Sequence, residues 1–356
     1  MADVDQALFE DRILLRTLAM RRTLFVPTVG TAADVEASSS VDVAAQERRR
    51  LEQYIDATGI ADPVDWLGGL ADTVLDALGT AEADGLSARE LTAAVPELAT
   101  RILMGRGTKH AVEAGATSRV LGLMAVEGHL VRGRPAGNWT GRQYRWHRRD
   151  RWWSSGDGPA TADRGPEAAA HGLLTRWLAR FGPATVTDMK WWTGWTMTKT
   201  RKILAGLDTV EVELAPPSGD GEPTVGHLLA DDVGPVAAPE PWAALLPALD
   251  PTPMGWKERD WYLGSHAGPL FDRNGNIGPT VWVDGRIVGC WSQNPDGEVV
   301  THLLEDVDAD RRRLIETEVE RMAAFIGSVI VKPSFPTPLQ KQLSLGEQPG
   351  DDGASG

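Results

Sequence analysis

Hydrophobic and polar positions recur with a helical period in the first part of the chain, which predicts amphipathic helices there. Residues 3–9 form a helical pattern with acidic residues in the first turn. Residues 31–57 form a second one, and its run Arg48–Arg50 favours a solvated helix face. Between these helices, residues 14–17 and 20–26 favour a pair of strands.

A second region, residues 62–153, carries the pattern of a winged helix-turn-helix. A helix is predicted over 65–78, and Ser87 with Glu90 forms a capping box for the next helix, which ends near Pro96. The apolar helix pattern of residues 116–126 is followed by strands at 129–132 and 142–146, with a Pro/Gly loop between them. Helix, strand, tip and strand is the order of a winged helix.

The same pattern repeats after a Ser/Gly-rich linker at residues 154–165. An amphipathic helix over 167–181 is broken by Gly182-Pro183, and two short helices follow, the first ending at Thr193-Gly194 and the second covering 196–205. Strands at 210–214 and 224–229 complete the pattern. We therefore predict another winged helix at 166–233, independent of the preceding one.

The pattern changes to short strands after the Pro-rich residues 234–241. Strands are predicted at 243–249, 280–283, 286–291, 299–304 and 329–331, with strong hairpin signals at Asp284-Gly285 and 294–297 and a helix at 309–326. The predicted fold is α+β, with tandem winged helix-turn-helix modules followed by a small C-terminal β-barrel-like domain. The predicted divisions are a truncated first winged-helix unit (1–60), a second winged helix (61–153), a linker (154–165), a third winged helix (166–233), the barrel-like domain (240–343) and a disordered tail (344–356).

Composition narrows the class of protein. The chain has 356 residues, 42% hydrophobic and 24% charged, as in a soluble globular protein of two or three domains. A single cysteine, Cys290, excludes an internal disulfide framework, and with seven scattered histidines it argues against a structural zinc site. No apolar run approaches the roughly 20 residues that span a bilayer. We expect a cytoplasmic protein without metal, cofactor or membrane association.

The distribution of charge points to a local anionic partner. The formal net charge is −14, yet residues 132–151 carry seven arginines against one acid, Asp150. Phosphate accounts best for such a cluster, and Trp139, Trp146, Trp152 and Trp153 could add contacts with a base or sugar. The alternative is a solvated hairpin whose tryptophans pack inward.

The candidate contacts with double-stranded DNA lie in both predicted modules. In the first they are arginines of the helix, the wing and the segment after it: Arg119, Arg132, Arg134, Arg142, Arg145, Arg148 and Arg149. In the third winged helix (166–233) they are Lys199, Arg201 and Lys202, on a predicted recognition helix. A solvated helix face is the alternative for these three residues. Trp191, Trp192 and Trp195 are predicted to lie in the core.

No catalytic motif stands out. A Ser-His-Asp order, a phosphate loop and a dinucleotide fingerprint are all missing, and Asp250 and Asp260 are weak acid/base candidates. Residues 272–276 imitate a calcium loop, but Ile277 replaces the required glycine and Val283 the required glutamate, so a turn is predicted.

Several segments resemble the AlkZ/YcaQ-like winged-helix proteins of bacteria. They are residues 10–12, 20–26 and 188–192, and above all 241–251 and 278–289, and the resemblance covers roughly residues 3–340. It implies tandem winged helices and a C-terminal β-barrel around duplex DNA, as in glycosylases that remove alkylated bases and unhook crosslinks. High Ala, Gly and Arg usage suits an actinobacterial source.

The resemblance also implies a catalytic polar motif ahead of the segment that matches Ala2–Asp11, and so upstream of Met1. We therefore expect an N-terminally truncated chain, with glycosylase activity only from a longer form. The alternatives are a sequence-specific transcriptional regulator and a non-catalytic member of the family. We expect a monomer, since the chain has no heptad or other dimer signature.

Overall fold

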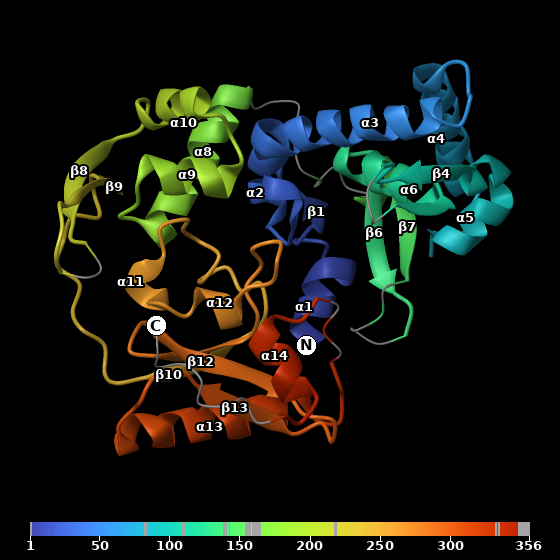
Figure 1. Cartoon of the computed structure of the whole chain (residues 1–356). Helices are drawn as coiled ribbons and strands as arrows, with labels where there is room; N and C mark the ends of the chain where they lie inside the picture. Colours follow the sequence, from blue (N-terminus) through green and yellow to red (C-terminus); the bar gives the residue numbers. More distant parts are fainter. Residues whose placement is uncertain are drawn as a thin grey trace. The chain divides into compact units, whose positions relative to one another are not determined.

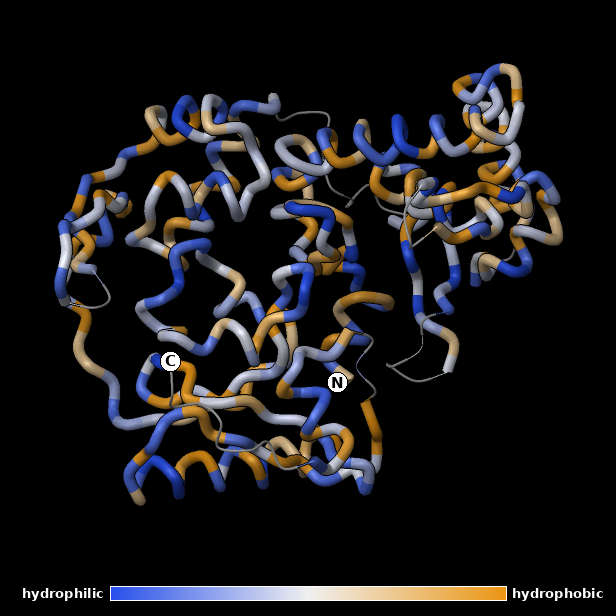
Figure 2. Tube along the Cα trace, in the orientation of Figure 1, coloured by the Kyte–Doolittle hydropathy of each residue, from blue (hydrophilic) through white to orange (hydrophobic). Residues whose placement is uncertain are grey.

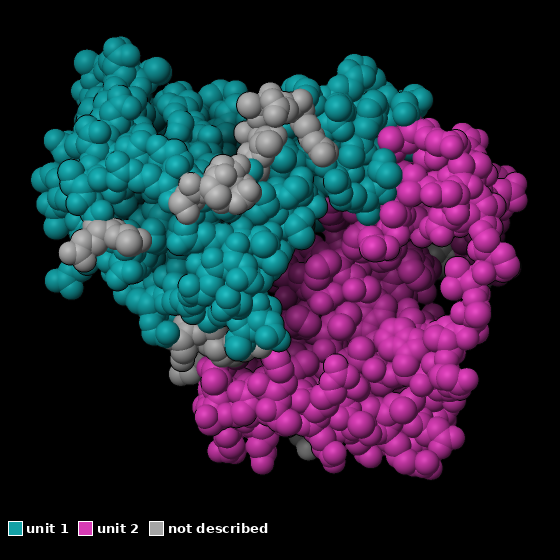
Figure 3. Space-filling model, turned by 180° about the vertical axis from the view of Figure 1, so that it is seen from behind, with its two compact units in different colours: residues 1–176, 193–206 teal, residues 177–192, 207–356 magenta. Residues whose placement is uncertain are grey.

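The computed structural model describes residues 2–81, 84–107, 111–137, 141, 143–153, 158, 165–216, 219–331, 333 and 335–347. The chain forms two compact units of mixed helix and sheet (Figures 1 and 3). Unit 1 comprises residues 1–176 and 193–206, and unit 2 comprises residues 177–192 and 207–356. The boundary falls inside the predicted third winged helix, and the finer predicted divisions stay a prediction. No helix of the described residues is long and apolar enough to cross a membrane.

Unit 1 begins with the predicted helix and strand pair. Helix α1 (Ala2–Asp5) runs into the π-helix η1 (Gln6–Glu10), and the short strands β1 (Thr17–Leu18) and β2 (Leu24–Phe25) pair around a 3₁₀ turn, η2 (Met20–Arg22). The helix predicted over 31–57 is confirmed. It consists of three successive segments: α2 (Val29–Val35), the π-helix η3 (Glu36–Ser40) and α3 (Val41–Asp56).

A helical core fills the middle of unit 1. Helices α3, α4 (Pro63–Gly79), α5 (Ala88–Ala94) and α6 (Thr117–Val126) bury one continuous apolar cluster that includes Leu51, Val74, Leu91 and Leu121. The predicted capping box is present, because Ser87 and Glu90 each bond the other's backbone N–H. A 3₁₀ turn, η4 (Pro96–Ala99), ends α5 at the proline, as predicted.

The two strands predicted after α6 are confirmed, and with a short strand before α5 that was not predicted they form a three-stranded sheet in the order β3-β7-β6. Its strands are β3 (Leu86–Ser87), β6 (Leu130–Pro135) and β7 (Tyr144–Arg148), and the short helix α7 (Arg149–Trp152) follows β7. Gly85 enters the sheet at φ +66°, where an added Cβ would lie 2.3 Å from the carbonyl oxygen of Trp146. A hairpin of β4 (Arg101–Met104) and β5 (Val112–Gly115) precedes α6 and was not predicted.

The helices predicted after the linker are confirmed as α8 (Pro166–Phe181), α9 (Val186–Thr193) and α10 (Met197–Leu204). Most of the linker itself lies outside the described residues. Helix α10 and the first part of α8 belong to unit 1, whereas nearly all of α9 belongs to unit 2. In unit 2, the predicted strands β8 (Thr209–Leu214) and β9 (Thr224–Leu229) pair as a hairpin.

The C-terminal part of unit 2 is an open sheet, so the predicted barrel is wrong. The strands β10 (Ala243–Leu246), β11 (Thr280–Val283), β12 (Arg286–Gln293) and β13 (Val299–Leu303) pair in this order without closing. Helix α13 (Ala309–Ile326) alternates hydrophobic and hydrophilic positions (Figure 2). It packs its apolar side, with buried Ile315, on one face of the sheet. Helices α11 (Asp260–Leu263), α12 (Ala267–Leu270) and α14 (Pro338–Ser344) cover the other face. Because helices cover both faces, the sheet stays open.

The last predicted strand, Val329–Val331, is also wrong. The side chain of Gln293 takes the place of a strand partner, since its Nε2 donates to the Val329 carbonyl at 3.0 Å and its Oε1 accepts from the Val331 N–H at 2.8 Å. Of the predicted tail, Ser344 ends α14 and residues 348–356 lie outside the described residues.

Candidate nucleic-acid interface

The two units differ sharply in charge. Unit 1 contains 24 Lys and Arg and 24 Asp and Glu, whereas unit 2 contains 12 and 26, so unit 2 holds the whole net charge of −14. The net charge therefore disfavours binding of a polyanion to unit 2, and in unit 1 it favours the positions where cations lack acidic neighbours.

Arginines stack on aromatic rings where the N-terminal segment meets β6, β7 and α7 in unit 1. Five such pairs lie here, with 4.3–5.6 Å from the guanidinium carbon to the ring centroid: Arg12 on Trp152, Arg16 on Tyr144, Arg132 on Trp146, Arg134 on Phe9 and Arg149 on Trp153. Trp146 and Trp152 are buried, so the inward-packing alternative holds for these two tryptophans. Trp139 lies outside the described residues.

Three of the predicted DNA-contacting arginines are bound to the protein itself. Arg145 donates to the carbonyls of residues 84 and 85 at 2.8 and 2.7 Å, and Arg148 donates to both oxygens of Asp150. The pair raises the pKa of Arg148 and lowers the pKa of Asp150 through these hydrogen bonds. Arg149 donates to both oxygens of Glu36 at 2.8 and 2.7 Å. These side chains tie β7 and α7 to the segments beside them.

The other predicted arginines of this module differ in their surroundings. Arg134 pairs with Asp5 and Glu10, at 2.9 Å each. Exposed Arg119 on α6 has only the sulfur of Met104 as a hydrogen-bond partner, and Arg132 has none among the described residues. Arg142 lies outside the described residues. Arg119 and Arg132 are therefore the predicted contacts that stay free for an anion.

His147 on β7 is a half-buried neutral group beside these arginines. Its burial, followed by the charges of Arg12 and Arg145, lowers its pKa from 6.5 to about 4, against a weaker opposing effect of Asp84. Its ring meets Trp152 edge-on with centroids 4.7 Å apart. At neutral pH this histidine adds no positive charge to the interface.

The predicted contacts on α10 are engaged to different degrees. Lys199 pairs with Asp42 at 3.2 Å and donates to the Ser38 carbonyl, and Lys202 pairs with Glu167 at 2.6 Å. Exposed Arg201 has no acidic partner among the described residues. Trp195 is buried as predicted, whereas Trp191 and Trp192 are half-buried.

The hairpin predicted as the wing of this module is acidic. Residues 207–240 contain eight Asp and Glu, including Glu211 and Glu213 on β8, and no Lys or Arg. This composition opposes contact with a phosphate backbone. The predicted DNA contacts of the third winged helix (166–233) therefore all lie on α10.

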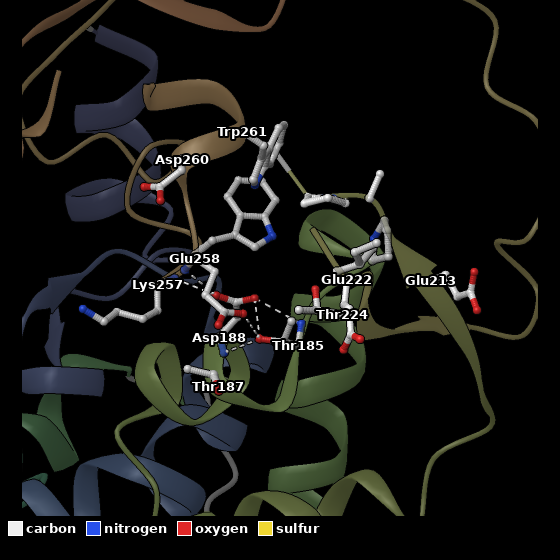
Figure 4. A pocket seen from close by; sticks show the side chains of 16 residues that line it. Thr185, Thr187, Asp188, Glu213, Glu222, Thr224, Lys257, Glu258, Asp260 and Trp261 are labelled. Carbon is white, nitrogen blue, oxygen red and sulfur yellow. Dashed lines mark hydrogen bonds between the residues drawn. The ribbon is translucent and has the colours of Figure 1, made fainter. Parts of the chain in front are cut away.

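Unit 2 contains a cavity of about 810 Å³ beside this hairpin (Figure 4). Trp256 and Trp261 line it together with five acids, Asp188, Glu213, Glu222, Glu258 and Asp260, and Lys257 is the one cation among its described lining residues. The side chain of Trp261 is half exposed, at 49%. The excess of carboxylates excludes a phosphate group from this cavity.

A buried carboxylate organises the floor of the cavity. Asp188 accepts from the backbone N–H groups of Lys257 and Glu258 at 2.8 Å each, and from the N–H and hydroxyl of Thr185 at 3.1 and 2.8 Å (Figure 4). The Thr185 hydroxyl also lies 2.6 Å from Glu258 Oε2. These bonds fix the segment 256–261 against α9, which is a structural role.

The weak catalytic and metal candidates form no site. Asp250 accepts from the Thr252 N–H in a turn, and Asp272 accepts from the N–H groups of Asn274 and Asn276, which confirms the predicted turn. No group of three metal-binding side chains occurs in the described part of the chain. Asp260 lines the acidic cavity.

Sequence reasoning missed the contribution of the N-terminal segment. Arg12 lies over Trp152 on α7 and Arg16 over Tyr144 on β7, although more than 100 residues separate these arginines from β7 in the chain. Arg12, Arg21 and Arg22 are held at positive φ, between 54° and 59°, which is uncommon for residues other than glycine. No periodicity in the sequence signals these tertiary contacts.

Comparison with known proteins finds a matching protein family and a similar solved structure, each over most of the chain. The family model described as "DNA glycosylase AlkZ-like" matches residues 1–325. Among solved structures, the DNA glycosylase AlkZ of Streptomyces sahachiroi is similar, with a TM-score of 0.62 and 21% sequence identity over 90% of this chain and 81% of that chain. At this identity the likeness shows a shared fold. The search of curated proteins finds no match.

Proposed function

Since the chain belongs to the AlkZ-like DNA glycosylase family, we propose that it binds duplex DNA through unit 1 and releases alkylated bases from it. The family match over residues 1–325 is the observation that carries the proposed reaction. Unhooking of crosslinks by the same cleavage is the finer form of this proposal.

The distribution of charge supports unit 1 as the part that binds DNA. Its candidate contacts are those of the predicted DNA-contacting residues that have no acidic partner among the described residues, Arg119, Arg132 and Arg201. Arg145, Arg148 and Arg149 tie β7 and the start of α7 to neighbouring segments. Unit 2, with its acidic cavity, keeps the polyanion on the other unit.

Base release is the hydrolysis of a glycosidic bond, in which water replaces the base at the anomeric carbon. The reaction needs a polar group that positions or activates this water, and an alkylated purine is a good leaving group because its ring carries positive charge. No residue is assigned this catalytic role. The structure supports the binding step, and the family supports the chemistry.

The test has two steps that separate binding from chemistry. Anisotropy of a labelled duplex, measured over a range of salt concentrations, should show binding that weakens steeply with salt and is similar for unrelated sequences. Single-turnover incubation with a duplex that contains N7-methylguanine should then release the base faster than it is lost spontaneously. Binding restricted to one sequence would instead indicate a regulator, and binding without release would indicate a non-catalytic member of the family.

A further inference from the structure

Arg16 has no partner for its hydrogen-bond donors. Its guanidinium lies over the ring of Tyr144, 4.8 Å from the centroid, and its Nε and Nη1 atoms are buried with no hydrogen-bond partner among the described residues. Stacking on a ring uses the face of a guanidinium, whereas its N–H groups point outward in the plane. The stacking therefore leaves the in-plane donors unsatisfied.

Arg132 lies close to Arg16 and also lacks a hydrogen-bond or ion-pair partner among the described residues, although none of its nitrogen atoms is among the fully buried, unpartnered ones. It stacks on Trp146 at 5.3 Å and forms no hydrogen bond or ion pair within the described ranges. Burial, and to a smaller extent the charge of Arg16, lower the pKa of Arg132, while Tyr144 acts in the opposite direction. The two positively charged side chains thus lie half-buried near each other, without a counter-ion among the described residues.

The other three stacked arginines have partners for their hydrogen-bond donors. Arg12 donates to the carbonyls of Phe9 and Trp152, Arg134 pairs with two carboxylates, and Arg149 pairs with Glu36. All five pairs lie on the same surface between the N-terminal segment and the wing strands. In this set, only Arg16 and Arg132 offer donors that nothing in the described residues accepts.

We propose that Arg16 and Arg132 form a site for one phosphate group on the hairpin β6-β7, where Arg132 pairs with Trp146 and Tyr144 begins β7. A tetrahedral phosphate offers several acceptor oxygens to two planar guanidinium forks and supplies the missing negative charge. Arg16, Arg132 and Tyr144 are each half-buried, so part of the site reaches solvent. Because the Nε and Nη1 atoms of Arg16 are themselves enclosed, the Arg16 side chain must turn outward when a phosphate binds. A backbone phosphate of duplex DNA is one source of the group, and this part rests on the proposed function; a free phosphate is the other.

The first test measures phosphate binding without DNA. Thermal unfolding of the wild-type chain, Arg16→Met and Arg132→Met is followed in sodium phosphate and in sodium chloride of equal ionic strength. The control is Arg134→Met, which removes a stacked arginine that already has acidic partners. Phosphate also stabilises proteins non-specifically, and the control reports that background. The wild type and the control should gain stability from phosphate beyond what the two site variants gain.

The same variants test whether Arg16 has only a structural role. An unpaired buried charge is costly, so Arg16→Met in chloride should unfold at the wild-type temperature or above it. If Arg16 instead stabilises the fold, Arg16→Met should unfold at a lower temperature than the wild type. If the methionine variants fail to fold, Arg16→Lys keeps the charge without the planar fork and should bind phosphate more weakly in a calorimetric titration.

The second test uses a duplex and distinguishes the source of the phosphate. Loss of one backbone contact should reduce the slope of log K against log salt by about one in Arg16→Met. A reduced slope together with loss of the phosphate effect supports a DNA phosphate. Loss of the phosphate effect with an unchanged slope supports a free phosphate, even where the proposed function fails. An equal phosphate effect in all four proteins overturns the site.

Discussion

Replacing Arg149 with Ala should destabilise unit 1 rather than remove a DNA contact. Arg149 donates two charge-assisted hydrogen bonds to Glu36, at 2.8 and 2.7 Å, and the two side chains are 16% and 12% exposed. Removing the arginine leaves a nearly buried carboxylate without its counter-ion. Such a loss costs about 3 kcal/mol, at the lower end for buried pairs because some solvent reaches both groups.

The assay is unfolding by heat and by urea, followed by duplex binding below both transitions. A loss of this size lowers the unfolding temperature by about 6–12 °C in a unit of this length. Glu36→Gln combined with Arg149→Ala should recover part of the loss, since no unpaired charge remains. Arg119→Ala, at an exposed site, should change stability by less than about 0.5 kcal/mol and weaken duplex binding. Wild-type stability with impaired duplex binding in Arg149→Ala would refute the structural role of this arginine.

Three further predictions concern single residues. The pKa of His147 is lowered to about 4 in the folded chain, so its contribution to stability is complete above pH 6.5 and is lost as the pH falls toward 4. In urea unfolding over this range, the free energy of unfolding of the wild type should fall by about 2–3 kcal/mol more than that of His147→Gln. Gly85→Ala should cost about 3 kcal/mol, since its Cβ would lie 2.3 Å from a carbonyl oxygen, whereas Gly107→Ala, at φ +80° with open space, should cost about 1 kcal/mol. Asp188→Ala should destabilise unit 2 by about 3 kcal/mol because three backbone N–H groups lose their acceptor, and Asp260→Ala in the same cavity should have little effect; equal losses in the two variants would contradict this account.

The helices and most strands could be predicted from sequence because their signals are local. The capping box at Ser87 and Glu90, the apolar stripe of α13 and the hairpin signal at Asp284-Gly285 each lie within a few residues of the element that they define. The strand predicted at 329–331 failed for a tertiary reason, since Gln293 supplies a side chain where a strand partner was expected.

The open sheet and the state of the wing arginines could not be predicted in this way. Strand β11 is buried on both faces, and a short apolar run does not show whether helices or other strands cover it. Likewise, the seven arginines of 132–151 look alike in sequence. Arg149 pairs with Glu36, which lies more than 100 residues earlier in the chain. Only the folded structure distinguishes Arg149, which has a counter-ion, from Arg132, which has none among the described residues.

Single-turnover base release from a duplex containing N7-methylguanine tests the proposed function most directly. With the duplex saturated by protein, the proposal predicts release well above the spontaneous rate, and weaker duplex binding after replacement of Arg119 or Arg132. Saturated binding with release at the spontaneous rate would contradict the proposed chemistry while leaving the interface on unit 1 intact.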